Sequence, residues 1–192
     1  MPGSARTERQ TVIPQHLSSS VEHFTPAFIV EAVRTVLGSI DLDPASCAKA
    51  QKTVRAAHWI GLPRDGLGEA WPTKRGGLFL NPPGGKADPS WSKRYGSRSS
   101  AVVWWRKLMD EWSNGNVGRA VFVGFNLDFL QAAQDKEKHW MSPLDFPFCV
   151  PRKRLAFTGD SPTHGNVIVY VGDQPERFVK TFSDIGGCVV PT

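Results

Sequence analysis

The chain has 192 residues, 40% of them hydrophobic, and its 23 basic and 18 acidic residues give a formal net charge of +5. This length predicts one domain, and its three widely spaced cysteines indicate neither a disulfide framework nor a metal site. No apolar run approaches the ~18 residues of a membrane helix. The positive charge favours a polyanionic partner such as nucleic acid, although generic basicity explains +5 equally well.

A polar arm and an amphipathic helix come first along the chain. Residues 1–20 are predicted to form a flexible arm, and residues 21–192 to form the domain. Thr25 is a good helix N-cap, and Pro26 is a good first helical residue. Apolar side chains then recur at helical spacing as far as Leu37, so a helix is expected there.

The next predicted element is a short strand that ends in carboxylates. Residues 40–43 alternate between apolar and acidic side chains, and Pro44 follows them. Asp41 and Asp43 are candidates to accept hydrogen bonds from a ribose diol or to pair with an ammonium group. The alternative is that Asp43 or Ser46 serves as the N-cap of a following helix.

A stiff elbow is predicted where the apolar run of residues 78–80 meets Asn81-Pro82-Pro83. Two prolines cannot donate to a sheet ladder, so the strand must end there. Open α/β sheets bind their ligands at the carboxyl ends of strands. An Asn carboxamide beside a fixed proline carbonyl offers two acceptors, which suits a substrate amino group. A Pro-Pro turn that merely ends the strand explains the Asn81-Pro82-Pro83 motif equally well.

Residues 85–100 are predicted to form a charged loop next to this elbow. Four basic residues are interleaved there with Trp91 and Tyr95, namely Lys86, Lys93, Arg94 and Arg98. Such a mixture suits neutralisation of a phosphate backbone and stacking on bases. A solvated charged loop is the competing interpretation.

The remaining chain alternates between helices and strands. Residues 101–112 have a helical apolar face that leaves Trp104 off the buried stripe. Further predicted elements are strands at 58–60 and 119–125, a helix at 129–140, a loop that leads into a short strand within residues 143–150, and a hairpin of 151–157 with 166–172. This order predicts an α/β fold with one three-layer sheet, mostly parallel and finished by a C-terminal antiparallel hairpin.

Three of these segments carry a resemblance to a known family. Asn81-Pro82-Pro83 resembles the catalytic signature of amino-methyltransferases, and Thr25-Pro26 and the segment 41–46 occur in the same order in phage-type, Dam-like DNA adenine-N6 methyltransferases. The resemblance covers residues 24–172. It implies a Rossmann-like methyltransferase sheet, S-adenosylmethionine as cofactor and DNA as partner, with methyl transfer to the N6 amine of a flipped adenine. We further expect a monomer or weak dimer in the cytoplasm of a bacterial host, encoded by a phage or prophage.

The resemblance also implies roles for individual residues, and no metal. The catalytic residues that would hold the target amine are Asn81, Pro82 and Pro83. The implied cofactor-binding residues are Thr25, Pro26, Asp41, Asp43, Pro44 and Asp65, the last of which lies in a segment that is also an ordinary turn signal. The residues expected to contact DNA are Lys86, Lys93, Arg94, Arg98, Trp104, Arg152, Lys153 and Arg154; a surface charge cluster is the alternative for the last three.

The sequence departs from the family at Gly84, where the family has an aromatic residue that stacks on the extruded base. Trp91, Tyr95 and Trp104 are the candidates to replace it, with Trp104 preferred because a helix would position it. Two alternatives stay open. One is a catalytically inactive, methyltransferase-like DNA-binding protein, which the glycine suggests. The other is a protein glutamine methyltransferase, which uses a similar elbow but fits the basic charge less well.

Overall fold

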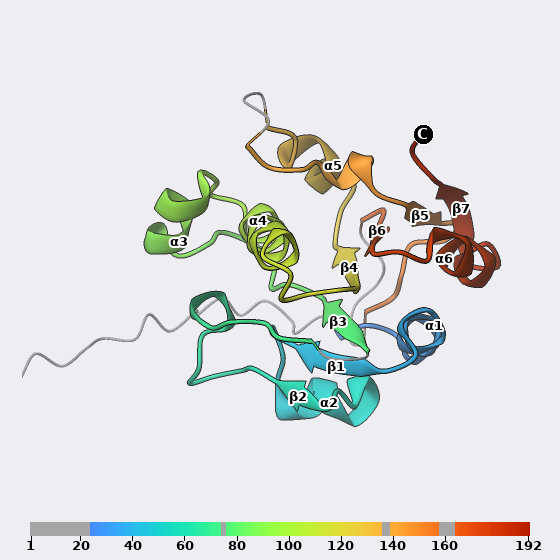
Figure 1. The fold of residues 1–192 in the computed structure, drawn as a ribbon, viewed down its shortest axis with the longest axis horizontal. Helices are drawn as coiled ribbons and strands as arrows, with labels where there is room; N and C mark the ends of the chain where they lie inside the picture. The colour runs from blue at the N-terminus through green and yellow to red at the C-terminus, as the bar shows by residue number, and fades with distance from the viewer. Residues whose placement is uncertain (1–23, 74–75, 136–138, 158–163) are drawn as a thin grey trace, which may run out of the picture.

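A single seven-stranded sheet organises the molecule (Figure 1). The computed structural model describes residues 24–73, 76–135, 139–157 and 164–192. In spatial order the strands are β2 (His58–Trp59), β1 (Ile40–Asp43), β3 (Gly77–Leu80), β4 (Ala120–Gly124), β6 (Val167–Val171), β5 (Phe148–Pro151) and β7 (Gly186–Val189). The first four pair in parallel and the other ladders are antiparallel, so five of the seven strands share one direction.

Helices cover both faces of the sheet. They are α1 (Ala27–Leu37), α2 (Ala48–Val54), α3 (Pro89–Tyr95), α4 (Ser100–Ser113), α5 (Asp128–Ala132) and α6 (Pro175–Phe182), with the short 3-10 turns η1 (Gly66–Gly68) and η2 (Pro143–Asp145). α1, α2 and α6 pack on one face, and α4 and α5 on the other (Figure 1). Within the described ranges, no helix is both long and apolar enough to cross a membrane.

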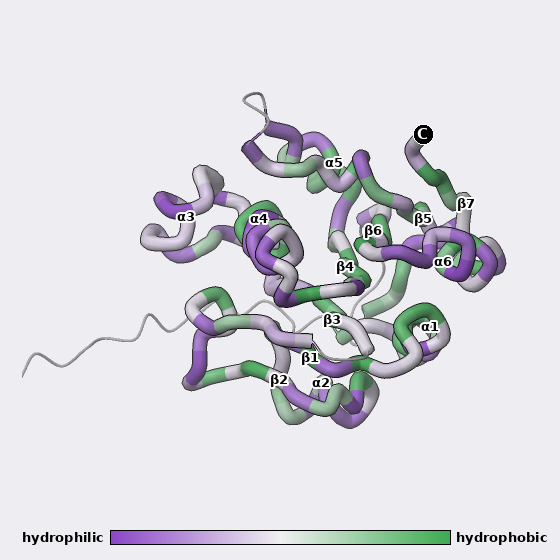
Figure 2. Tube along the Cα trace, in the orientation of Figure 1, coloured by the Kyte–Doolittle hydropathy of each residue, from purple (hydrophilic) through white to green (hydrophobic). Residues whose placement is uncertain are grey.

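The sequence of β3 shows how the two cores are built. Leu78 and Leu80 belong to the core under α4, whereas Phe79 belongs to the core under α1. Successive strand residues point to opposite faces, so a strand buried on both faces must be apolar throughout. β4 and β6 are buried along their whole length for the same reason. In Figure 2, α1 carries long hydrophobic stretches, whereas α3 is coloured mainly in hydrophilic tones.

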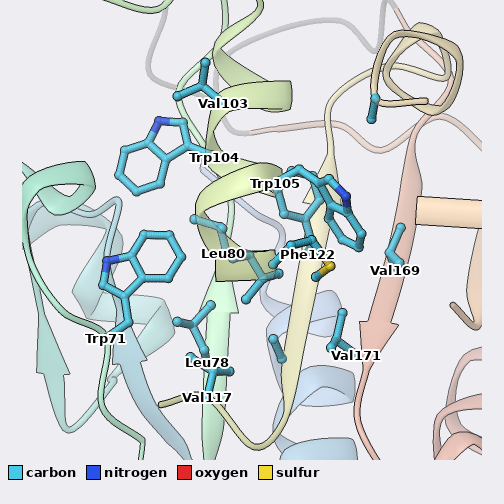
Figure 3. Packing of buried hydrophobic residues seen from close by; sticks show 14 of the residues in the cluster. Trp71, Leu78, Leu80, Val103, Trp104, Trp105, Val117, Phe122, Val169 and Val171 are labelled. Atoms are coloured by element: carbon cyan, nitrogen blue, oxygen red, sulfur yellow. The ribbon is translucent and has the colours of Figure 1, made fainter. Parts of the chain in front are cut away.

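The core under α4 is centred on Trp105 (Figure 3). Its ring meets those of Phe122, Phe129 and Phe146 edge-on, with centroids 5.4, 5.9 and 5.6 Å away. Edge-to-face packing of this kind adds to the stabilisation that comes from burial alone. The indole nitrogen donates to the Met141 carbonyl at 2.8 Å, which satisfies the one polar atom of the ring.

The structure confirms the coarse sequence predictions. The fold is α/β, with one mostly parallel sheet in a layout consistent with a Rossmann-like arrangement. The predicted strands at 40–43, 58–60, 78–80, 119–125 and 166–172 are β1, β2, β3, β4 and β6, and the helices at 28–37 and 101–112 are α1 and α4. The predicted arm, residues 1–20, lies outside the described residues.

Two predicted elements have different bounds. Residues 151–157 do not form the first strand of the closing hairpin. The strand that pairs antiparallel with β6 is Phe148–Pro151, which matches the short strand predicted within residues 143–150. Residues 152–154 are exposed, because their cationic side chains have no place inside a sheet. The helix predicted at 129–140 ends at Ala132, since the chain offers no apolar side chain between Ala133 and Trp140.

Residues 85–100 are not the loop that we predicted. They contain α3, which begins after Asp88, whose carboxylate accepts from the Ser90 amide at 2.9 Å. Pro89 occupies the first helical position, and Gly96 ends the helix in a left-handed conformation with φ of 63°. The capping signals were present in the sequence, but seven residues are too few to show a helical apolar stripe.

The prediction that Thr25 caps the first helix is also wrong. Pro26 is the N-cap residue, and the amides of Ile29 and Val30 donate to its carbonyl rather than to a side chain. The hydroxyl of Thr25 is therefore not used by the helix.

Candidate functional site

The carboxyl ends of β1 and β3 meet at one edge of the sheet. The two strands are parallel neighbours, and Leu42 is opposite Leu78. Asp43 follows the first of these residues, and Asn81 comes at the end of β3. The chain continues from β1 to β2 on one side, while β3 lies on the other side, so the strand order reverses between β1 and β3. Such a reversal point is where open α/β sheets bind ligands.

Asp43 is the most perturbed carboxyl at this edge. It is only 2% exposed, and burial raises its pKa from 3.8 to about 6. Hydrogen bonds from Ser46, the Ala45 amide and Gln51 oppose this rise without cancelling it. All three donors are neutral, so the ionised carboxylate is buried without a cation among them.

Gln51 holds Asp43 in place, and the sequence analysis did not single it out. Its side-chain nitrogen donates to Asp43 Oδ2 at 2.9 Å and to Ser46 Oγ at 2.7 Å. Its oxygen accepts from the Ala56 amide at 2.9 Å. All of these bonds are made by the folded chain, so the sequence carried no signal for this role of Gln51.

Asp41 lies away from this edge and is not brought together with the other residues expected to bind the cofactor. Its carboxylate accepts from the Gly76 amide at 2.9 Å and from Ser39 Oγ at 3.1 Å. Both partners lie where β1 and β3 begin, at the opposite edge of the sheet. Asp41 therefore joins two strand starts, and its role is structural.

The elbow itself is accessible. Asn81 is half-buried and Pro82 is buried, whereas Pro83, Gly84 and Gly85 are exposed. A Cβ built on Gly84 meets nothing within 4 Å, and the positive φ of 80° belongs to Gly85 instead. Position 84 can thus carry a side chain without strain, although here it offers no stacking surface.

Thr25 and Pro26 lie at the start of α1, at the same edge as Asp43. α1 has 11 residues, so it is ~16 Å long, and Gly38 and Ser39 join its far end directly to the start of β1. Thr25 is 6% exposed, and its hydroxyl has no hydrogen-bond partner among the described residues. A buried hydroxyl without a partner costs free energy, so it calls for an explanation.

The segment that contains Asp65 packs directly on the end of β1. A Cβ on Gly66 would lie 2.0 Å from the Pro44 carbonyl oxygen, so only glycine allows this approach. Asp65 Oδ1 accepts from the Leu67 amide at 3.0 Å, and Oδ2 accepts from Trp91 Nε1 at 2.7 Å. The structure thus brings Asp65 beside Pro44, as expected for a shared site. Both carboxylate oxygens of Asp65, however, already accept hydrogen bonds within the protein.

The chain from Gly85 to Ser100 forms a basic excursion that starts and ends beside the elbow. Its two ends are tied together by bonds from the Ala87 amide to the Arg98 carbonyl, 2.9 Å, and from the Ser100 amide to the Gly85 carbonyl, 3.0 Å. Four exposed cations lie on it: Lys86, Lys93, Arg94 and Arg98. These four of the eight residues expected to contact DNA therefore lie on one segment.

Two of the three candidate stacking aromatics are buried. Trp104 is 6% exposed and stacks on Trp71 with centroids 5.7 Å apart, as Figure 3 shows. The prediction that Trp104 lies off the buried stripe is wrong, because Trp71, which precedes β3, covers that side of α4. Tyr95 is 1% exposed. Only Trp91 keeps part of its surface, with the Arg94 guanidinium 5.6 Å from its ring centroid.

The second basic cluster also follows a strand that ends at this edge. Lys153 and Arg154 are exposed, but Arg152 donates to the Ser183 and Asp184 carbonyls, both at 2.8 Å, where α6 ends. Arg152 therefore has a structural task that the sequence did not indicate.

Asn166 is a further residue that the sequence analysis missed. It is 2% exposed, its oxygen accepts from the Leu155 amide at 2.9 Å, and its nitrogen donates to the Phe125 carbonyl at 2.7 Å. It fixes the chain after the basic cluster to the end of β4, which neighbours β3.

An open groove of about 410 Å³ lies beside β2, lined among others by Leu42, Trp59, Arg64 and Glu69. Neither Thr25 nor Asn81 lines it. Within the described ranges, no group of three or more His, Cys, Asp or Glu side chains is placed to hold a metal ion.

Comparison of the chain with protein-family models, with curated proteins and with solved structures finds no match in any of the three.

Proposed function

We propose that this protein transfers a methyl group from S-adenosylmethionine to the exocyclic N6 amine of adenine in DNA. One observation carries the proposal: Asp43-Pro44 and Asn81-Pro82-Pro83, on which the resemblance rests, end adjacent parallel strands at the reversal point of the sheet. A Pro-Pro turn that merely ends a strand does not account for the buried carboxyl, held by neutral donors, at the end of the neighbouring strand.

The residues at this edge fit the polar part of the cofactor. The Thr25 hydroxyl is buried, with no partner among the described residues, and can bond to a polar ligand. The ionised form of Asp43, disfavoured by burial, would be stabilised by the cofactor's ammonium group or by its ribose hydroxyls. Pro26, Pro44 and the segment that begins at Asp65 would complete the wall.

When bound, the cofactor supplies an electrophilic methyl group on a sulfonium. The task of the protein is then to position the adenine amine, whose lone pair is delocalised into the base. In the proposed complex both amine protons are held, one by the Asn81 side-chain oxygen and one by the Pro82 carbonyl. These bonds favour a more tetrahedral nitrogen, so positioning and electrostatics do most of the work.

Exposed cations lie at the same edge of the sheet as the elbow and suit a DNA substrate. The excursion between Gly85 and Ser100 would neutralise phosphates near the flipped base, and Lys153 and Arg154 would do so from the side of β5. Trp91 is the aromatic residue that we now assign to the base, because Tyr95 and Trp104 are buried.

A methyl-transfer assay tests the proposal. The protein is incubated with methyl-labelled S-adenosylmethionine and with single-stranded DNA, duplex DNA or a glutamine-containing protein extract. Label in DNA that is recovered as N6-methyladenine supports the proposal, and Asn81→Ala should abolish it.

The same assay separates the alternatives. DNA binding without label in any substrate would favour the non-catalytic DNA-binding protein, which the open, aromatic-free position at Gly84 suggests. Label in protein instead of DNA would favour glutamine methylation. Either result overturns the proposal.

A further inference from the structure

Two cysteines lie directly opposite each other at the far edge of the sheet. Cys149 on β5 and Cys188 on β7 are partners in an antiparallel ladder. Residues opposite each other in such a ladder point to the same face, with their Cα atoms roughly 4.5–5.5 Å apart. A disulfide needs a Cα separation of about 4.4–6.8 Å, so the backbone already meets this condition.

The two side chains also share one environment. Cys149 is fully buried, and Cys188 is half-buried and packs against the same core cluster. Burial, and after it the charge and hydrogen bond of the Cys188 thiol, raise the pKa of the Cys149 thiol to about 12. Cys188 is therefore the thiol that a reagent reaches first, and Cys149 lies in contact with it from the inside.

β7 is the strand that such a bond would secure. It begins with Gly186 and Gly187, and Val189 is 48% exposed. Gly186 is required because a Cβ there would lie 2.1 Å from the Val150 carbonyl oxygen. Glycine-rich edge strands are weakly held, and within β7 only the Cys188 side chain packs against the core cluster.

We propose that Cys149 and Cys188 form a reversible cross-strand disulfide on exposure to a small-molecule disulfide such as oxidised glutathione. The Cys188 thiolate attacks one sulfur of glutathione disulfide and releases one glutathione thiolate. The Cys149 thiolate then attacks the Cys188 sulfur of the mixed disulfide and releases the second. Two protein thiols are oxidised, one glutathione disulfide is reduced, and the two protons end on two glutathione thiols.

The bond has a structural consequence that is independent of the proposed methyl transfer. It closes a chain segment of roughly 40 residues, which removes entropy from the unfolded state. Cys149 also lies three positions before Arg152, which holds the end of α6 through the Ser183 and Asp184 carbonyls. The disulfide and this clamp together would fix the β5–α6–β7 unit.

The test is a redox titration of the purified full chain in glutathione buffers. Free thiols are alkylated in denaturant, and the digested protein is analysed by mass spectrometry. We expect a linked pair of peptides containing Cys149 and Cys188, with Cys47 alkylated throughout. The melting temperature should rise by roughly 5–10 °C on oxidation and return on addition of dithiothreitol.

Three variants make the result specific. Cys188→Ser should lose both the link and the rise in melting temperature, and Cys149→Ala serves the same purpose should the first variant not fold. Cys47→Ser is the matched control and should keep both. Persistent alkylation of Cys149 and Cys188 under oxidising buffers would overturn the inference. A link that involves Cys47, or glutathione held on Cys188 without closure, would overturn it as well.

Discussion

Strand β1 carries two aspartates that are two residues apart and have opposite fates. Asp41, at the amino edge of the sheet, accepts from the Gly76 amide and from Ser39, and these bonds join two strand starts. Asp43, at the carboxyl edge, is buried with neutral donors alone, and its pKa rises to about 6. One edge is built for stability, while the other keeps a group whose charged form is disfavoured. Such groups cluster at functional sites.

Thr25 extends the comparison. Its buried hydroxyl, at the carboxyl edge, has no partner among the described residues. At the amino edge, the Thr73 hydroxyl accepts from the Gly118 amide at 3.3 Å. The contrast predicts that substitutions at the carboxyl edge change function, whereas substitutions at the amino edge change stability.

The largest expected effect is that of Asn81→Ala on methyl transfer. Loss of one pre-positioned hydrogen-bonding group costs roughly 100–1000-fold in rate, and Asn81 contacts the amine rather than the cofactor. Cofactor affinity should therefore stay within a few-fold. Single-turnover assays with labelled cofactor measure the rate.

Asn116→Ala is the matched control for this variant. Asn116 is an exposed asparagine that donates to Glu111 near the start of β4, at the amino edge. The Asn116→Ala variant should keep the wild-type rate of methyl transfer. Near wild-type methylation by Asn81→Ala would remove the elbow from the mechanism.

The second effect concerns Trp91, the remaining stacking candidate. Base–aromatic stacking is worth roughly 1–3 kcal/mol per base, so Trp91→Ala should lower DNA methylation at least tenfold without unfolding the protein. Adding Gly84→Tyr should restore activity, because position 84 has room for a side chain. Trp112→Ala, which removes a half-buried indole near the end of α4, at the amino edge, is the control. Full activity of Trp91→Ala would show that the base stacks elsewhere.

The third effect is on the free energy of unfolding, which substitutions of Asp43 and Asp41 should change in opposite directions. The folded-state pKa of Asp43 is raised, so the native state binds more protons and stability falls as pH rises from about 4 to about 6. A shift of this size corresponds to about 3 kcal/mol. Asp43→Asn should therefore raise the free energy of unfolding at pH 7 by roughly 1–2 kcal/mol, since some hydrogen-bond geometry is lost.

Asp41→Asn should act in the opposite direction and lower this free energy by about 1 kcal/mol, because the bonds to Gly76 and Ser39 lose a charged acceptor. Urea unfolding at pH 4 and pH 7 measures both. The same sign for the two variants would mean that the edges do not differ as described.

The smallest effect is on the salt dependence of DNA binding. Each phosphate neutralised contributes about −0.9 to the log–log slope of affinity against salt concentration. Arg94→Gln should make the slope shallower by about this amount, whereas Lys180→Gln, an exposed cation on α6, should leave it unchanged. Binding that does not vary with salt in the wild type would favour a protein substrate.

The sequence predicted the elements that place the site, because their signals are local. The apolar run before Asn81 and the two prolines after it specify a buried strand with an abrupt end. The alternation of residues 40–43 predicted β1 in the same way. The basic residues between Lys86 and Arg98 were found by composition, although their helix was not.

Other features depend on contacts between distant segments and were not readable. Trp104 is buried because Trp71 stacks on it from 33 positions away, and Asp41 is structural because β3 starts beside it. Asn166 joins strand ends that only the folded sheet brings together. α6 was missed although Pro175 and the pair Phe178 and Phe182 signal a helix start and one apolar face.

The central claim is that the carboxyl edge binds the cofactor, and isothermal titration with S-adenosylmethionine tests it most directly. We predict one site per chain in the wild type. Thr25→Val, which removes a buried hydroxyl with no partner in the described part of the chain, should weaken binding about tenfold without loss of stability. Ser39→Ala, at the amino edge, should bind as the wild type does. No measurable binding to the wild type, or equal affinity in all three proteins, would contradict the account.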